Sequence, residues 1–126
     1  MKRVWFGAGL LVVLLAVSLG VAWGMEEIHN PIAAALKQPA ECAQRGDCHT
    51  AEVFSRRAES AWKQWEHFRA CFADHTPTEE VGAEMAAMDT ARQERETADF
   101  AASCARAAKM VKAVGDAHVL CWWNLL

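Results

Sequence analysis

The strongest candidate for chemistry in this chain is a trio, His67, Cys71 and His75, in which neighbours are four residues apart. In one continuous helix this spacing puts all three side chains on the same face, with Glu66 and Asp74 close by. Imidazole and thiolate groups at such a spacing are ligands of zinc or copper. The chain has no HExxH motif and no pair of CxxC motifs. The trio is therefore a weak metal candidate, and we expect no resident cofactor.

The same side chains also suit structural roles. His75 would interact favourably with the C-terminal end of a helix dipole, Cys71 would be buried, and His67 would face solvent. Two adjacent carboxylates, Glu79 and Glu80, diverge on a helix and suit its first turn better than they suit an acid/base pair. We therefore expect no catalytic residues and a protein that is not an enzyme.

The five cysteines of the chain raise the question of disulfides. Cys42 and Cys48 flank Gly46-Asp47, a predicted turn, so a bridge between them is geometrically feasible. Its loop is short, and its stabilisation would be about 2 kcal/mol or less. The odd number of cysteines leaves at least one thiol unpaired within the chain. The alternative is that all five thiols are reduced.

An uncharged run of twenty residues, 4–23, lies next to the N-terminus. As a helix that rises about 1.5 Å per residue, it would extend roughly 30 Å, the thickness of the hydrocarbon core of a bilayer. Residues 1–24 are therefore predicted to form a transmembrane signal anchor.

The charges around this run predict its orientation. Lys2 and Arg3 precede it, whereas Glu26 and Glu27 follow it, and the positively charged end of a span stays in the cytoplasm. We expect a single-pass protein of the cell membrane with a cytoplasmic N-terminus and an extracytoplasmic domain.

Small side chains within the run support two further interpretations. Ser18 and Gly20, or Gly20 and Ala22, match the small residues before a signal-peptide cleavage site. The run exceeds an ordinary signal core, so we favour an uncleaved anchor. Ala16, Gly20 and Gly24 recur every four residues, and such a stripe would let another transmembrane helix pack closely.

The remainder, residues 25–126, is long enough for one small domain. It contains all sixteen acidic residues and eleven of the thirteen Lys and Arg residues, so its net charge is about −5. That charge does not suggest binding to nucleic acid. The absence of Tyr, the scarcity of β-branched residues and the abundance of Ala, Glu, Arg and Met favour helix over sheet.

Apolar side chains recur at helical spacing in four stretches of this domain. The clearest is 50–73, where Trp65 occupies the middle of a seam that would face a partner helix. A second seam covers 100–114, a weaker stripe covers 81–88, and another begins at Ile28 and is interrupted at Pro39. The first seam comprises Phe54, Ala58, Ala61, Trp65, Phe68 and Phe72, and the second comprises Phe100, Cys104, Ala107, Val111 and Val114. The pattern predicts an all-α fold in which a transmembrane helix precedes an antiparallel bundle of three to four helices.

Three short segments are predicted turns. Gly46 suits the left-handed end of a helix, and Asp47 suits the cap of the next one. Thr76 before Pro77 is typical of a helix start, because a proline in the first turn loses no hydrogen bond. The third turn lies within 94–99, where Thr97 or Asp99 would be the cap.

Several short motifs along the chain can be compared with a known family. They are Gly46-Asp47, Ala51, Trp62, Phe72, Asp74-His75 and Asn124-Leu125-Leu126. With the N-terminal anchor, they resemble the DUF4363 family of small membrane-anchored helical proteins, which occur mainly in Clostridia and related Gram-positive bacteria. The resemblance covers nearly the whole chain but not its cysteines. It implies the architecture and the location, and no chemistry.

The C-terminal segment 118–126 is apolar almost throughout. Because such a segment would aggregate if it were left in water, we expect contacts for Trp122, Trp123, Leu125 and Leu126. They would contact the protein's own helices, a protein partner or the bilayer interface, which favours Trp.

These features predict a non-catalytic accessory or interaction subunit of a bacterial membrane assembly, with a protein partner. The alternative is an extracytoplasmic metal-binding or redox protein that uses His67, Cys71 and His75.

Overall fold

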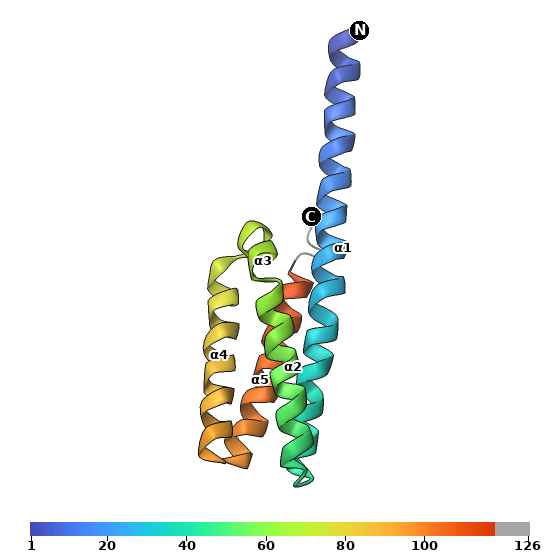
Figure 1. Ribbon diagram of the computed structural model, residues 1–126. Coiled ribbons are helices and arrows are strands. Elements are labelled where there is room, and N and C mark those ends of the chain that lie inside the picture. Colours follow the sequence, from blue (N-terminus) through green and yellow to red (C-terminus); the bar gives the residue numbers. More distant parts are fainter. Residues whose placement is uncertain (118–126) are drawn as a thin grey trace.

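The computed structural model describes residues 1–117, which form five helices and no strand (Figure 1). In chain order the helices are α1 (Lys2–Gln44), α2 (Cys48–Gln64), α3 (Glu66–Phe72), α4 (His75–Glu94) and α5 (Thr97–Asp116). The predicted all-α fold, a long apolar N-terminal helix followed by a helical bundle, is confirmed.

Helix α1 is a single helix of 43 residues that serves two parts of the molecule. Its first half stands clear of the other helices (Figure 1), and the apolar side chains of 4–19 are exposed. Contact with the bundle begins at Val21, and Met25 is completely buried. The boundary between the predicted anchor, 1–24, and the predicted domain, 25–126, therefore lies inside one continuous helix.

The predicted interruption at Pro39 is wrong, because α1 passes through both Pro31 and Pro39. An internal proline removes one backbone hydrogen bond and costs about 3 kcal/mol in a free helix. Here Ile32 and Leu36, which precede Pro39 on the same helix, are buried against the bundle, and Pro39 is buried with them. Tertiary packing therefore outweighs the local cost of the proline.

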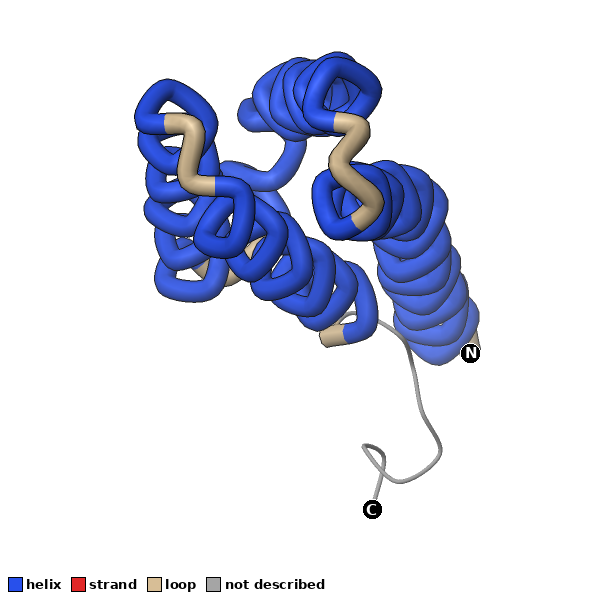
Figure 2. Tube along the Cα trace, turned by 90° about the horizontal axis from the view of Figure 1, so that it is seen from below, coloured by secondary structure: helices blue, strands red, loops and turns tan. Residues whose placement is uncertain are grey.

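The bundle consists of two helical hairpins that meet along α1 and α5. Helix α2 packs against α1, helix α4 packs against α5, and the α1–α5 contact is the most extensive of all. Seen end-on, α5 lies between α1 and α4, and a gap separates α2 from α4 (Figure 2). The short helix α3 connects α2 to α4 at the end nearest the anchor (Figure 1).

The turn at Gly46-Asp47 is confirmed. Gly46 has a φ of +83°, which a side chain would strain. Asp47 caps α2 by accepting a hydrogen bond from the backbone N–H of Thr50 at 3.1 Å. Hydrogen bonding with Thr50, first through its side chain and second through its backbone N–H, lowers the pKa of Asp47 below its ordinary value.

The other two turns occur where they were expected, but with different caps. Helix α4 begins at His75 because Asp74 accepts a hydrogen bond from the N–H of Thr76, so Thr76 is not the cap. Between α4 and α5, Arg95 has a φ of 60°, and Glu96 occupies the cap position of α5, but its side chain makes no capping hydrogen bond. Neither Thr97 nor Asp99 is therefore the cap there.

The predicted stripes of α4 and α5 are confirmed as core. Val81, Met85 and Met88 of α4 are buried. The buried members of the α5 seam are Phe100, Cys104, Ala107, Val111 and Val114. The α1 side of the core includes Met25, Ile32, Ala33, Leu36, Ala40 and Ala43.

The prediction that Trp65 lies in the core is wrong. Helix α2 ends at Gln64 and α3 begins at Glu66, so the stretch 50–73 is not one helix. The change of direction at Trp65 leaves its side chain 39% exposed, whereas Trp62, one turn earlier, is 6% exposed. Trp62 is therefore the aromatic anchor of α2.

This difference predicts opposite costs for the two tryptophans. Trp62→Ala should reduce the free energy of unfolding by about 3–5 kcal/mol, because a large cavity opens in the core. Trp65→Ala should cost about 1 kcal/mol, through its edge contact with Phe68. Denaturant unfolding followed by circular dichroism in detergent measures both values, and Lys63→Ala on the exposed side of α2 is the control. Equal costs for the two variants would contradict this packing.

A second prediction concerns the close approach of α5 to α1. A Cβ at Gly115 would lie 2.9 Å from Cβ of His29 and 3.7 Å from the carbonyl oxygen of Met25. Gly115→Ala should therefore push the helices apart and reduce the free energy of unfolding by about 1–3 kcal/mol.

The matched control is Gly82→Ala in α4, where a Cβ would meet nothing within 4 Å. That change should stabilise the helix by up to about 1 kcal/mol. If both variants are stabilised in the same denaturation experiment, the α1–α5 contact is looser than described.

Candidate functional site

A groove runs between α2 and α4 and contains three consecutive pockets. Their volumes are about 450, 420 and 470 Å³. The first and second pockets share Arg92, and the second and third pockets share Glu59, Lys63 and Asp89. The gap between the two helices in the end-on view marks its position (Figure 2). We call this feature the α2–α4 groove, and it is the candidate functional site.

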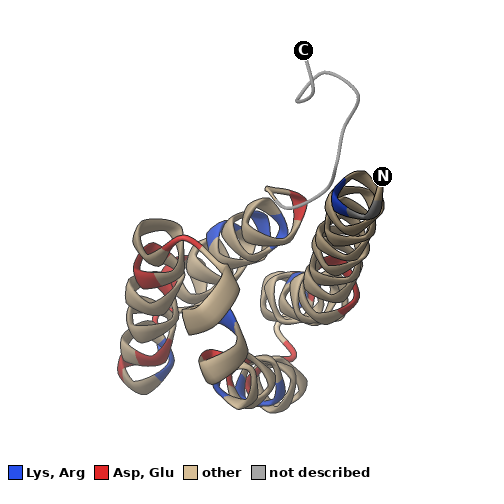
Figure 3. Ribbon diagram, turned by 90° about the horizontal axis from the view of Figure 1, so that it is seen from above, with Lys and Arg blue, Asp and Glu red and all other residues tan. Residues whose placement is uncertain are grey.

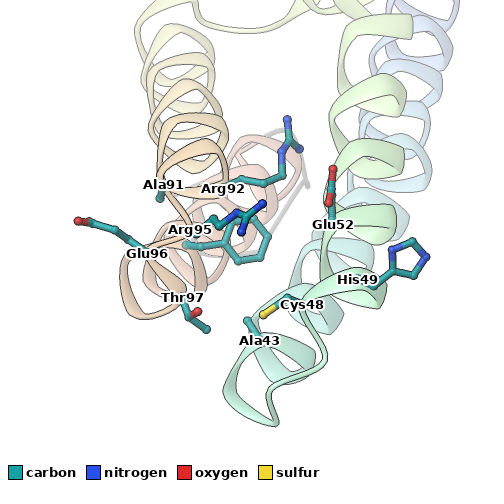
Figure 4. Close-up of a pocket in the computed structure, with 10 residues that line it drawn as sticks. Ala43, Cys48, His49, Glu52, Ala91, Arg92, Arg95, Glu96 and Thr97 are labelled. Carbon is teal, nitrogen blue, oxygen red and sulfur yellow. The ribbon is translucent and has the colours of Figure 1, made fainter.

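The first pocket (Figure 4) lies at the end of the bundle that is farthest from the apolar segment of α1 (Figure 1). Cys48, His49 and Glu52 from the first turns of α2 form one wall. Arg92 and Arg95 project from α4 toward that wall, whereas Glu96 points away from it. The other lining residues are Ala43, Ala91, Thr97 and Phe100. Two cationic side chains therefore face one carboxylate across this end of the groove.

Glu52 is held in its charged form. Its carboxylate accepts hydrogen bonds from Nε and Nη2 of Arg56, at 3.1 and 2.9 Å. These bonds lower the pKa of Glu52, and the nearby charge of Arg92 lowers it further. Arg56 therefore already neutralises the carboxylate that faces Arg92 and Arg95.

Arg92 joins the two walls of the groove. Its Nη1 donates a hydrogen bond to Oγ of Ser55 in α2 at 3.3 Å, and its guanidinium forms an ion pair with Asp89 on α4. Its Nε is buried and has no hydrogen-bond partner among the described residues. A buried donor without a partner costs about 1–3 kcal/mol, and more when the group is charged.

Arg69 is the most deeply buried charged side chain, at 2% exposure. Its Nη2 donates to the carbonyl of Trp62 near the end of α2, and its Cζ lies 3.5 Å from the centroid of the Trp62 ring. Burial lowers the pKa of Arg69 to about 10, and the charge of Glu66 opposes part of this shift. Arg69 therefore stays charged at neutral pH.

Arg69 also borders the third pocket, at the end of the groove nearest the anchor. Its Nε and Nη1 are buried and have no hydrogen-bond partner in the described part of the chain. Two of the arginines that line the groove, Arg69 and Arg92, thus keep buried guanidinium nitrogens without a partner among the described residues. Both arginines could donate charge-assisted hydrogen bonds to an incoming carboxylate.

The groove as a whole is amphipathic. Trp62, Met85, Ala91 and Phe100 contribute apolar surface to it. Its acidic residues are Glu52, Glu59, Glu66, Glu79, Asp89 and Glu96, and its basic residues are Arg56, Lys63, Arg69, Arg92 and Arg95. Because the two signs are nearly balanced, the groove is suited to an amphipathic surface and not to a strongly charged ligand.

The predicted metal trio is not assembled. His67 and Cys71 belong to α3, whereas His75 starts α4 after an extended residue, Ala73, and the capping residue Asp74. The helical spacing on which the prediction rested ends at that break. Within residues 1–117, no group of three His, Cys, Asp or Glu side chains could hold a metal ion.

Other predicted residues are placed as follows. Cys42 and Cys48 carry free thiols in this structure, which contains no bridge between them. A disulfide between them under oxidising conditions stays a prediction. Gly24 lies against Phe68 of its own chain, whereas Gly20 has no neighbour within 4 Å. The packing stripe formed by Ala16, Gly20 and Gly24 stays a prediction for its exposed members. Trp122, Trp123, Leu125 and Leu126 lie outside the described residues.

Comparisons of the chain with protein-family models, with curated proteins and with solved structures find no match. The resemblance to the DUF4363 family therefore stays a prediction.

The sequence-based reasoning missed Arg69 and Arg92. One signal was present for Arg69, because it follows Trp62 by seven residues and so lies on the same side of an approximately helical chain. No comparable signal exists for Arg92, whose partner Ser55 is 37 residues away.

The burial of Cys104 predicts a large difference in reactivity among the thiols. Burial raises the pKa of Cys104 to about 12, whereas Cys48 and Cys71 are exposed. At pH 8, Cys104 would have roughly a thousandfold less thiolate than a thiol at the ordinary value of 9.0. Reaction with a disulfide reagent should therefore be fast at Cys48 and Cys71 and very slow at Cys104.

The measurement uses single-cysteine variants of the full chain, and unfolding in denaturant provides the control. The Cys104 variant should become as reactive as the other two once it is unfolded. Fast reaction of folded Cys104 would contradict the described α4–α5 core.

Proposed function

We propose that this protein is a non-catalytic, membrane-anchored interaction module, and that its α2–α4 groove binds one α-helix of a partner protein. The single observation that carries the proposal is the groove itself. Its two end pockets combine apolar lining residues with an arginine whose guanidinium nitrogens are not all satisfied, and a polar middle pocket lies between them.

Membrane anchoring is supported by α1. The helix is long and apolar enough to cross a bilayer, and none of its most apolar window is buried inside the protein. By the positive-inside rule, Lys2 and Arg3 would keep the N-terminus in the cytoplasm and direct the bundle outward.

The dimensions of the groove support a helix as the ligand. Its α2 wall and the start of α3 extend from His49 to Glu66, which corresponds to roughly 26 Å of helix rise. A partner helix of about 17 residues would occupy this length. Helices α1 and α2, α1 and α5, and α4 and α5 already pack in pairs, whereas α2 and α4 do not. The partner helix would fill this remaining side by packing its side chains between those of α2 and α4.

The chemistry of the groove indicates what such a helix should carry. Apolar side chains on one face would cover Trp62, Met85 and Phe100, in the way that amphipathic helices occupy hydrophobic grooves. Carboxylates at its edges would satisfy the free nitrogens of Arg69 and Arg92. The expected partner is therefore an amphipathic helix with acidic residues near both ends of the contact.

The proposal is tested with a photo-cross-linking amino acid in the full chain, expressed in cells that make the protein. Ser60 lines the groove, whereas Arg57 is exposed on the same helix outside it. Position 60 should give a discrete adduct whose cross-linked peptide, identified by mass spectrometry, is an amphipathic helical segment. Position 57 should give none.

A second pair of variants tests whether the groove is the cause. Ala86 lines the groove on α4 and Ala87 is exposed beside it. Ala86→Trp should fill the groove and abolish the adduct at position 60, and Ala87→Trp should leave it unchanged. An absent adduct, an equal adduct at position 57, or an adduct that survives Ala86→Trp would each overturn the proposal.

A further inference from the structure

Helix α3 lies at the end of the bundle from which the anchor emerges (Figures 1 and 3). Trp65, which directly precedes α3, forms a row of aromatic rings with Phe68 and Phe72 of α3. The ring centroids of Trp65 and Phe68 are 6.3 Å apart, and those of Phe68 and Phe72 are 5.0 Å apart. The outer members, Trp65 and Phe72, are 39% and 46% exposed. We call these three residues the α3 aromatic row.

Phe68 determines the height of this row along α1. A Cβ at Gly24 would lie 3.8 Å from Cζ of Phe68, and Gly24 follows directly after the uncharged run that ends at Trp23. Val21, inside that run, already packs against the core. The row is therefore level with the last turn of the apolar segment.

This height corresponds to a particular layer of a bilayer. If residues 4–23 fill the hydrocarbon core, the headgroup layer covers roughly the next 5–7 Å. That distance is about four residues of helix rise, and it begins at Gly24. A bundle held at this height brings α3 into the headgroup layer.

The charges of α3 favour a membrane interface of low charge. Its one arginine, Arg69, is turned into the bundle, so α3 offers no exposed Lys or Arg to anionic lipids. Exposed Trp and Phe rings are instead suited to the boundary between headgroups and acyl chains.

We infer that α3 rests on the membrane and that Trp65 and Phe72 insert among the lipid headgroups. The inference rests on the proposed anchoring of α1 in a bilayer. It adds a second membrane contact beside α1, and two contacts prevent the bundle from swinging about the anchor. The α2–α4 groove would therefore face a constant direction relative to the membrane.

The test uses the full chain in phosphatidylcholine vesicles, with a nitroxide spin label on one cysteine at a time. The label is placed on Cys71 in α3, on Cys48 at the far end of the bundle, or on Leu14→Cys within the anchor, and the remaining cysteines are replaced by Ala or Ser. Collision rates with oxygen, which concentrates in lipid, and with a water-soluble nickel chelate report the depth of each label. The ratio of oxygen to nickel collisions should be highest at position 14, intermediate at Cys71 and lowest at Cys48.

Two further variants identify what covers α3. The combination Trp65→Gln and Phe72→Gln should make the Cys71 label as accessible to nickel as the Cys48 label. Val53→Gln, at an exposed apolar residue of α2, should leave Cys71 unchanged. An unaltered unfolding transition shows that these variants remain folded.

Three results would overturn the inference. The Cys71 label could match the Cys48 label while position 14 lies in lipid, which rejects the α3 contact and leaves the anchor intact. Deletion of residues 118–126 could expose Cys71, which would show that the chain's own C-terminus covers α3. Position 14 could itself be exposed to nickel, in which case both this inference and the proposed anchoring fail.

Discussion

Gly115 lets α5 approach α1 so closely that a β-carbon at this position would lie 2.9 Å from Cβ of His29. The contact between these two helices is the most extensive in the bundle, and it joins the α1–α2 hairpin to the α4–α5 hairpin. Its core combines Met25 and Leu36 of α1 with the seam of α5. Because α2 and α4 each pack on one of these two central helices, their separation, and with it the groove between them, is set by how closely α1 and α5 lie.

The continuity of α1 gives this contact a second consequence. A flexible linker between the apolar segment and the bundle would leave the two free to turn relative to each other. Here one helix contains both segments, and it continues through Pro31 and Pro39 because packing against α2 and α5 offsets the lost hydrogen bonds. The direction of the apolar segment is therefore transmitted directly to the bundle, and the end that carries α3 is the end nearest that segment (Figure 1).

The buried arginines are the least expected feature of a domain this small. Placing a guanidinium in a core is unfavourable unless its donors are satisfied. A hydrogen bond to the Trp62 carbonyl and stacking on the Trp62 ring offset part of this unfavourable free energy for Arg69. For Arg92, a hydrogen bond to Ser55 and an ion pair with Asp89 offset part of it. The nitrogens that remain lie along the groove. The middle pocket of the groove is lined by polar side chains, and the two end pockets mix polar and apolar ones. A simple packing defect would instead be apolar throughout.

The sequence by itself determined the helical class, the turn at Gly46-Asp47 and the buried stripes of α4 and α5, because spacing, capping and glycine conformation act over only a few residues. Only the tertiary structure decided which tryptophan of α2 is buried, since the chain changes direction at Trp65 and ends the spacing that was projected through it. The same holds for the metal trio, which required a helix to continue past Asp74. The groove could not be predicted at all. Its walls come from α2 and α4, whose facing residues are some 37 positions apart, as in the Arg92–Ser55 pair, and contacts over that distance depend on how helices pack and not on local spacing.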